Sequence, residues 1–190
     1  MMRPANRVIQ IATIFGYDTK LPVRGSEEAA GIDVFVPTYN EAFEKDFEKM
    51  NSNPRDPDFK PAYGFGYGTI RIPDTGPFIH IPPHRRVVIP TGLRMKVEVG
   101  TYLEVANRGS MAAKHGLIFG AHIIDSDYRG NVFINLINTS EVQQRIDFGQ
   151  KLAQLLHKSV LMSDVKLISD EEYNRERTTR GDGALGSTGR

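Results

Sequence analysis

The chain has 190 residues, enough for one domain with a buried core and little room for a second. Lysine and arginine total 24 against 23 aspartates and glutamates, so no bulk positive field indicates a nucleic-acid partner. The absence of cysteine excludes disulfides, thiolate zinc sites and cysteine nucleophiles. Because neither a signal-peptide pattern nor a long apolar run occurs, we expect a cytoplasmic location and no membrane contact.

Short apolar runs recur between turn signals and predict an all-β fold of the sandwich or barrel type. The 18 glycines and 11 prolines agree with a chain that turns often. The predicted strands cover residues 8–15, 32–36, 78–81, 87–89, 93–97, 102–106, 132–137 and 151–157. Polar and apolar residues alternate at the fifth of these strands, which predicts that Met95, Val97 and Val99 face the core.

The stretch 38–76 interrupts this rhythm, and we interpret it as an insertion between strands. Its apolar spacing predicts a helix over 40–51, begun by a capping box of Thr38 and Glu41, so the insertion is expected to be partly helical. Two interpretations stay open at this point. The insertion is either a decorated loop or a lid or surface that binds a protein partner.

The last residues, 171–190, are polar and rich in glycine, so they need a ligand or a neighbour to order them. We therefore predict a β domain over 1–170, with its insertion at about 38–76, followed by a flexible arm over 171–190.

Two segments could carry chemistry. Asp125 and Asp127 lie between apolar runs, which presents their carboxylates at a strand-to-strand turn, although such turns are common without any function. The segment after residue 107 follows a strand and begins a short helix, where free N–H groups, Arg108 and Ser110 could bind an anion. The five histidines have no zinc-ligand spacing, and no serine lies in a nucleophile elbow.

The order of the segments is more informative than any one of them. Five segments resemble, in sequence, the five motifs of the trimeric dUTPase family, and the third is the most specific match. They cover residues 30–34, 108–114, 123–130, 148–155 and 180–189. The resemblance therefore spans nearly the whole chain outside the insertion.

The resemblance implies a distorted jelly roll, a β-clip barrel of the dUTPase type, with one short helix near the second motif. It implies hydrolysis of dUTP to dUMP and pyrophosphate by a homotrimer whose active sites lie between subunits, each completed by an exchanged C-terminal arm. It also implies Mg²⁺ as cofactor, held by phosphates and water without a direct protein ligand. Asp33 and Gln154 would then occupy outer-sphere positions.

The resemblance also assigns roles to residues. Asp125 would activate the attacking water, and Tyr128 would pack on the deoxyribose and exclude a ribose 2'-hydroxyl. Asp33, Lys114 and Gln154 would be auxiliary. The substrate-binding residues would be Arg108, Gly109, Ser110, Ile123, Ile124, Tyr128, Arg180, Leu185, Gly186 and Ser187.

Several positions depart from the family pattern. The usual Arg-Ser-Gly of the second motif has its hydroxyl one residue later, on Ser110. Leu185 replaces a phenylalanine that closes over uracil, Lys151 replaces an arginine, and His122 replaces a glycine in the uracil hairpin. Since Asp125 is retained, we expect a working hydrolase with relaxed affinity or base selectivity.

Two alternatives belong to other classes of function. One is a nucleotide-gated binding or regulatory module that uses the insertion as its partner surface, although the retained Asp125 argues against pure loss of catalysis. The other is a relative of dCTP deaminase, whose catalytic glutamate aligns with Asn135. An amide cannot act as a base, which disfavours deamination.

Overall fold

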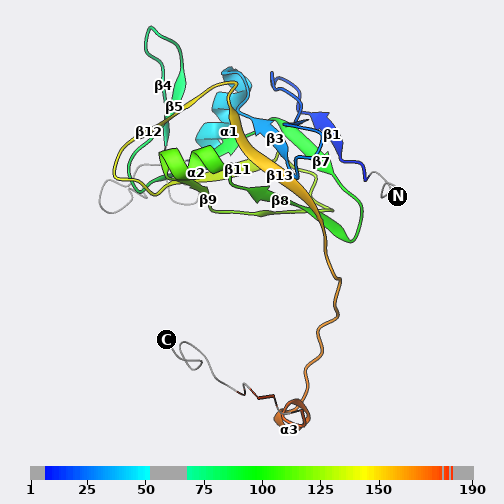
Figure 1. Ribbon diagram of the computed structural model, residues 1–190. Coiled ribbons are helices and arrows are strands. Elements are labelled where there is room, and N and C mark those ends of the chain that lie inside the picture. The colour runs from blue at the N-terminus through cyan, green and yellow to red at the C-terminus, as the bar shows by residue number, and fades with distance from the viewer. Residues whose placement is uncertain (1–6, 52–67, 177, 180, 182–190) are drawn as a thin grey trace. The chain divides into compact units, whose positions relative to one another are not determined.

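The computed structural model describes residues 7–51, 68–176, 178, 179 and 181 (Figure 1). The chain divides into two compact units, Met1–Val160 and Leu161–Arg190, and each is described by itself. The domain boundary near residue 170 and the extent of the insertion stay predictions.

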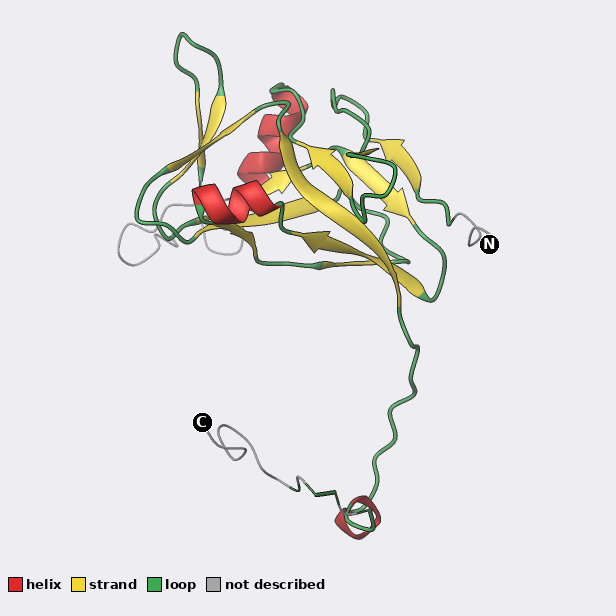
Figure 2. Ribbon diagram, in the orientation of Figure 1, coloured by secondary structure: helices red, strands yellow, loops and turns green. Residues whose placement is uncertain are grey.

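The first unit consists mainly of strands and loops, and its described residues also form the helices α1 and α2 (Figure 2). The predicted all-β class is confirmed. In chain order the elements of this unit are β1 (Gln10–Thr13), β2 (Val23–Arg24), β3 (Ile32–Phe35), α1 (Glu41–Asn51), β4 (Thr69–Arg71), β5 (Phe78–Ile81), β6 (Arg86–Pro90), β7 (Leu93–Lys96), β8 (Thr101–Ala106), α2 (Gly109–His115), β9 (Leu117–Phe119), β10 (Ile123–Asp125), β11 (Phe133–Asn138), β12 (Gln144–Asp147) and β13 (Lys151–Ser159).

The strands form four small sheets, and every pairing among the described residues is antiparallel. The largest sheet has the order β10-β8-β13-β3-β2, so β13 lies between two strands that are distant in sequence. The others are β1-β7, β6-β11-β9 and β12-β5-β4. Every predicted strand overlaps an observed one, whereas the sequence pattern did not predict the short strands β2, β4, β9, β10 and β12.

The core follows the alternation that antiparallel strands with one buried face require. Along β11, residues Ile134, Leu136 and Asn138 are buried, while the side chains between them are half-buried. Asn138 is accommodated inside because its amide contacts the carbonyl oxygens of residues 81, 82 and 142 at 3.1, 3.0 and 2.8 Å.

The predicted helix of the insertion is confirmed as α1, and it belongs to the core. Phe43 is 0% exposed and Phe47 is 4% exposed, and the ring of Phe43 packs edge-on against Phe148 with 5.0 Å between centroids. The predicted capping box is wrong. The side chain of Asn40 caps the helix by accepting from the Phe43 N–H at 3.0 Å, while the Thr38 N–H donates to a carbonyl elsewhere.

The predicted burial of Val99 is also wrong, although Met95 and Val97 are buried as expected. Val99 is 89% exposed because β7 ends at Lys96 and the chain turns at Gly100, whose φ is +80°. Only glycine adopts that backbone conformation readily. The alternating sequence pattern therefore extended three residues beyond the end of the strand.

The second unit contains one short helix among its described residues, α3 (Asp170–Tyr173). Its first turn is capped by the hydroxyl of Ser169, which accepts from the Glu172 N–H at 3.2 Å. Leu161, Val165 and other apolar side chains before it are exposed. No helix in the part of the chain that the structure describes is long and apolar enough to cross a membrane.

Candidate active site

Three of the predicted motifs meet around one carboxylate. The Asp33 side chain on β3 contacts Arg108 Nε at 3.2 Å and Lys151 Nζ at 2.7 Å, and it is only 14% exposed. Arg108 Nη1 also donates to the Lys151 carbonyl at 3.1 Å. These residues are brought together because β13, which begins at Lys151, pairs with both β3 and β8. The result is a preorganised cationic cluster around Asp33, suited to phosphate oxygens.

Gln154 of the fourth motif completes this cluster. It lies opposite both Asp33 and Ala106 in the sheet, and its Nε2 donates to the Asn107 carbonyl at 2.7 Å. Gly31 of the first motif leaves room for this amide, because a Cβ at that position would lie 2.8 Å from Gln154 Oε1 and displace it. The glycine therefore allows the amide to reach the backbone just before Arg108.

The predicted short helix near the second motif is confirmed as α2. It starts directly after Arg108, whose backbone is extended, and Arg108 makes no side-chain cap. The Arg108 carbonyl accepts from the backbone N–H groups of residues 111 and 112. Ser110 and Lys114 are exposed on this helix. The hydroxyl of Ser110 is thus on the first turn, one residue after Gly109.

The third motif forms an exposed turn after β10. Asp125 is exposed, and its carbonyl accepts from the Tyr128 N–H at 3.2 Å. Tyr128 is 41% exposed, and its hydroxyl donates to the Asn131 carbonyl at 2.8 Å. A Cβ at residue 130 would lie 2.4 Å from that hydroxyl, so Gly130 is required for this ring position.

The segment 122–131, named the Asp125 hairpin below, contains the remaining residues around this turn, and its strand β10 pairs with β8. Ile123 is 57% exposed and Ile124 is half-buried against the core. His122 stands just before β10, where its Nδ1 lies 2.9 Å from the Val105 carbonyl and its own carbonyl accepts from the Val105 N–H. The side chain that replaces a glycine is thus held against β8.

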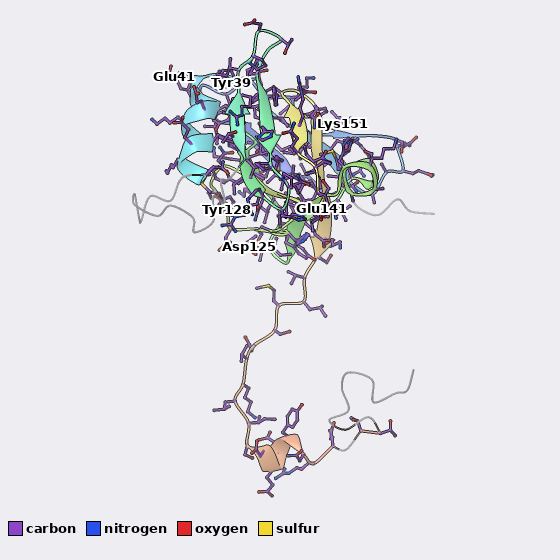
Figure 3. The ribbon with its side chains drawn as sticks, turned by 90° about the vertical axis from the view of Figure 1, so that its left-hand side faces the viewer. Tyr39, Glu41, Asp125, Tyr128, Glu141 and Lys151 are labelled. Atoms are coloured by element: carbon purple, nitrogen blue, oxygen red, sulfur yellow. The ribbon has the colours of Figure 1, made fainter. Side chains whose placement is uncertain are left out.

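Asp125 and the cationic cluster lie at opposite ends of β8. Asp125 pairs with Tyr102 near the start of the strand, whereas Arg108 follows its end. At about 3.3 Å per residue, this separates the two backbones by roughly 15–20 Å. Figure 3 shows Lys151 well away from Asp125 and Tyr128. One chain therefore does not bring its own Asp125 to its own Arg108.

Lys151 and the predicted arm residues remain to be placed. Lys151 enters the sequence pattern only as a departure from the family, yet it makes the shortest contact to Asp33. Its place within the fourth motif was the available signal. The predicted arm residues Arg180, Leu185, Gly186 and Ser187 lie outside the described residues.

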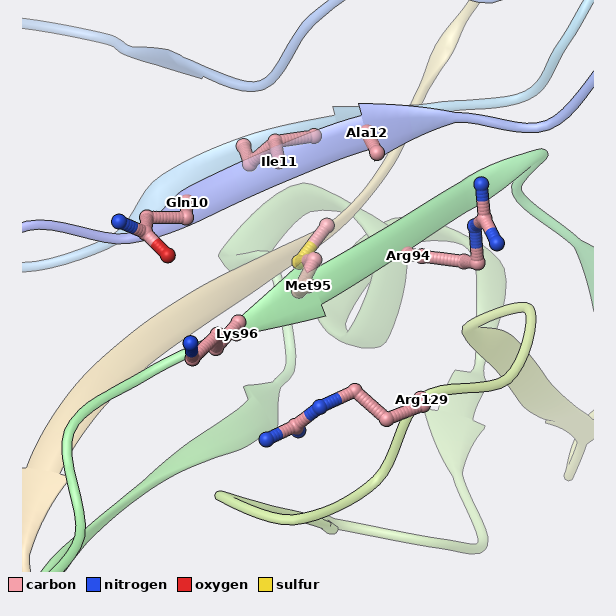
Figure 4. Close-up of a pocket in the computed structure, with 7 residues that line it drawn as sticks. All are labelled: Gln10, Ile11, Ala12, Arg94, Met95, Lys96 and Arg129. Carbon is pink, nitrogen blue, oxygen red and sulfur yellow. The ribbon is translucent and has the colours of Figure 1, made fainter.

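A cavity of about 290 Å³ lies beside the hairpin, between the β1-β7 ribbon and Arg129 (Figure 4). Arg94 and Lys96 also line it, together with Gln10, Ile11, Ala12 and Met95. The Arg129 guanidinium is already bonded to the carbonyls of residues 126 and 128, at 2.7 and 2.9 Å. None of the described residues that line this cavity is a carboxylate, so it lacks a base for hydrolysis.

Comparisons with known proteins show the family to which the chain belongs. The dUTPase family model matches residues 78–189. The deoxyuridine 5'-triphosphate nucleotidohydrolase of Candida albicans is 43% identical over 110 residues, covering 58% of this chain and 68% of that protein. The one from Solanum lycopersicum is 32% identical over 142 residues, covering 75% of this chain and 79% of that protein.

The fold is also similar to that of a solved dUTPase. The dUTPase of Staphylococcus bacteriophage 80alpha, solved with dUpNHpp, superposes with a TM-score of 0.67. The match covers 97% of this chain and 100% of that one, at 17% sequence identity. The fold is therefore of the dUTPase type, which defines a class of β-structured nucleotide hydrolases. This chain belongs to the dUTPase family and is an enzyme of that family.

Proposed function

We propose that the protein hydrolyses dUTP to dUMP and pyrophosphate, with Asp125 as general base. The observation that carries this proposal is the separation of an exposed Asp125 hairpin from a preorganised cluster of Asp33, Arg108 and Lys151. Each half has one part of the chemistry: the hairpin holds a carboxylate and the cluster holds cations. General-base and electrostatic catalysis require that both act on the same phosphate ester.

A second copy of the chain supplies the missing half in this proposal. In a symmetric homotrimer, Asp125 of one subunit would face the Arg108 cluster of the next. The two groups would then be close together although they are far apart within one chain. The arm of a further copy would bring Arg180, Leu185, Gly186 and Ser187. The assembly is supported by family membership and by the separation of Asp125 from Arg108 within one chain, and the arm exchange is supported by family membership.

The hairpin would recognise the nucleoside. Backbone groups of Ile123 and Ile124 would meet the uracil, and Tyr128 would pack on the deoxyribose. The ring of Tyr128 is held by its bond to the Asn131 carbonyl and is still 41% exposed, so it has a free face for a sugar. A fixed ring leaves little room for an additional 2'-hydroxyl.

Asp125 would position a water molecule and accept its proton as the water oxygen bonds to the α-phosphorus. The bond from that phosphorus to the bridging oxygen breaks, and pyrophosphate leaves with the electron pair. Arg108, Gly109 and Ser110 would contact the phosphate oxygens, with Arg180 from the arm. General-base catalysis of this kind contributes about 10² to 10⁴ in rate.

The residues present fit a magnesium ion that is held mainly by the substrate. Among the described residues, no group of three or more histidines, aspartates and glutamates could hold a metal ion. Asp33 is already paired with two cations, and Gln154 is bonded to the backbone, so both suit outer-sphere contacts through water. When bound, Mg²⁺ offsets the charge of the triphosphate and polarises the phosphoryl group.

The experiment that tests the function is product identification. The protein is incubated with Mg²⁺ and separately with dUTP, dCTP, dTTP and UTP, and the products are separated by anion exchange. We expect dUMP and pyrophosphate from dUTP. Formation of dUTP or dUMP from dCTP would instead favour the deaminase class, in which a residue other than Asn135 would have to act as the base.

The Asp125→Asn variant tests the proposed base. It should bind dUTP with unchanged affinity and turn it over at least about 10²-fold more slowly. Asp127→Asn is the matched control, since Asp127 is an exposed carboxylate in the same turn, and it should remain active. Near-normal turnover by Asp125→Asn would remove Asp125 from the mechanism.

Truncation before Arg180 tests the proposed arm. The shortened chain should keep its oligomeric state by light scattering and lose most hydrolysis, because the proposed arm supplies ligand contacts and the described core residues all precede Lys158. Full activity of the shortened chain would contradict the arm assignment.

A nucleotide-gated regulatory role is the second candidate, and one comparison favours it. The phage 80alpha dUTPases are described as controlling the transfer of virulence genes by a G protein-like mechanism. Deletion of the whole stretch 38–76 would remove Phe43 and Phe47 from the core. Replacement of residues 52–67 alone is the sharper test, since Asn51 and Gly68 bond to β6 at residues 88 and 86. Retained hydrolysis with lost partner binding would favour this role.

A further inference from the structure

A partly buried polar network joins the insertion to the third motif. The Tyr17 hydroxyl donates to Asp46 Oδ2 at 2.8 Å. Asn131 Nδ2 donates to the same carboxylate oxygen at 3.2 Å and lies 3.4 Å from the Tyr17 hydroxyl. These residues come from the turn after β1, from the middle of α1 and from the end of the Asp125 hairpin. One oxygen therefore ties together three segments that are distant in sequence.

Both the oxygen and the nitrogen of the Asn131 side-chain amide make hydrogen bonds. Its Oδ1 accepts from the Gly92 N–H at 3.0 Å, while its Nδ2 makes the contacts to Asp46 and Tyr17. Its backbone carbonyl accepts from the Tyr128 hydroxyl at 2.8 Å. Asn131 is thus the direct link between Asp46 and the ring that is proposed to pack on the sugar.

The packing around this link is close. Gly92 has φ +69°, and a Cβ there would lie 2.3 Å from Tyr17 Cδ1. Tyr17 therefore packs directly on the backbone that holds the Asn131 amide. Burial raises the pKa of Tyr17 well above its ordinary value, and the hydrogen bond to Asp46 raises it further. Tyr17 accordingly remains a hydrogen-bond donor throughout the neutral range.

The helix that carries Asp46 cannot shift easily. Phe43 and Phe47 anchor its apolar face in the core. At its last residue, Asn51 Nδ2 donates to the Val88 carbonyl at 2.9 Å, and Asn51 Oδ1 accepts from the Val88 N–H at 2.9 Å. The helix is fixed by packing on one face and by a pair of strand-like bonds at its end.

We propose that Asp46, together with Tyr17, is a positioning residue that holds Tyr128 through Asn131 and so sets the discrimination against a ribose 2'-hydroxyl. This inference rests on the proposed function, since it assigns the insertion helix a part in substrate selection at the same site. Without the Asp46 oxygen, Asn131 Nδ2 keeps only its longer contact to the Tyr17 hydroxyl, and the Asn131 side chain is held mainly by the Gly92 N–H. The Tyr128 ring can then move aside and make room for a ribose 2'-hydroxyl.

The experiment compares kcat/KM for dUTP and for UTP in four proteins, with the thermal midpoint of each as a measure of folding. They are the wild type, Asp46→Ala, Asp46→Asn and the control Glu48→Ala, which removes an exposed carboxylate from the same helix. Asp46→Ala should lower the ratio of the two kcat/KM values by about threefold to tenfold, the size of one lost hydrogen bond. Asp46→Asn keeps an oxygen that can accept both bonds, so it and the control should keep the ratio within about twofold.

A second variant keeps the test decisive if Asp46→Ala does not fold. Tyr17→Phe keeps the ring against Gly92 and removes only the hydroxyl, and it should also lower the ratio. If the wild type prefers dUTP and both variants keep its ratio, or lose activity equally on both substrates, the positioning role is overturned and the proposed function stands. If the wild type does not hydrolyse dUTP, the proposed function fails and the positioning role falls with it.

Discussion

Gly31→Ala tests how closely the first and fourth motifs pack. The added Cβ would lie 2.8 Å from Gln154 Oε1 and 3.1 Å from Gln154 Cβ. The amide must therefore turn away, which breaks its 2.7 Å bond to the Asn107 carbonyl. Gly25→Ala is the matched control, because its nearest neighbour, Asp33 Oδ2, would lie at 3.7 Å, an ordinary contact.

The expected cost has two parts. The lost hydrogen bond is worth about 0.5–1.5 kcal/mol, and the contact to Gln154 Cβ adds strain at the low end of the usual range of about 1–3 kcal/mol for overpacking. A total of about 2 kcal/mol lowers the melting temperature by roughly 4–8 °C in a protein of this size.

The assay is thermal unfolding followed by circular dichroism, together with dUTP turnover at a temperature where the variant is folded. We expect lower stability for Gly31→Ala than for the control, and slower turnover because Gln154 leaves its position beside Asp33. A Gly31→Ala protein that melts with the wild type would refute the close-packing argument.

Three further variants test other parts of the structure. Asp33→Asn leaves Arg108 and Lys151 without their carboxylate, and the partial exposure of these pairs limits the expected loss to about 1–2 kcal/mol by urea denaturation. That loss should shrink in about 1 M salt, and a salt-independent loss would contradict its electrostatic origin. Burial lowers the pKa of His157, so the unfolded chain takes up its proton first as the pH falls below about 6.5, and stability decreases from there toward the folded pKa. His157→Gln should flatten this part of the stability profile, and parallel profiles for the two proteins would count against it. Asn138→Ala removes an amide that is 0% exposed and should cost about 2–4 kcal/mol, whereas a cost below about 1 kcal/mol would show that its carbonyl partners find other donors.

The sequence motifs propose site residues but do not show how the fold brings them together, and the roles of these residues stay predictions. Asp33, Arg108 and Gln154 were each assigned from separate motifs, but nothing local in them says that they meet. Their meeting depends on β13 pairing with β3 on one side and β8 on the other. Such pairing is set by packing between distant strands, which periodicity within one strand does not encode.

Local rules failed where the backbone or a neighbouring side chain decided the outcome. The alternation that placed Val99 in the core was interrupted by the turn at Gly100. The cap of α1 came from Asn40, directly before the helix, and Thr38 was engaged elsewhere. The hydrogen bond between Asp46 and Asn131 could not be predicted from the sequence, because no recognisable motif contains both residues.

The proposed function places the base and the cationic cluster of one active site on different copies of the chain. Its most direct test is co-expression of Asp125→Asn with Arg108→Ala, each nearly inactive alone. Random mixing in a trimer gives about a quarter of the sites both native residues, so the mixture should recover roughly that share of wild-type turnover. A mixture no more active than its separate components would contradict the shared site.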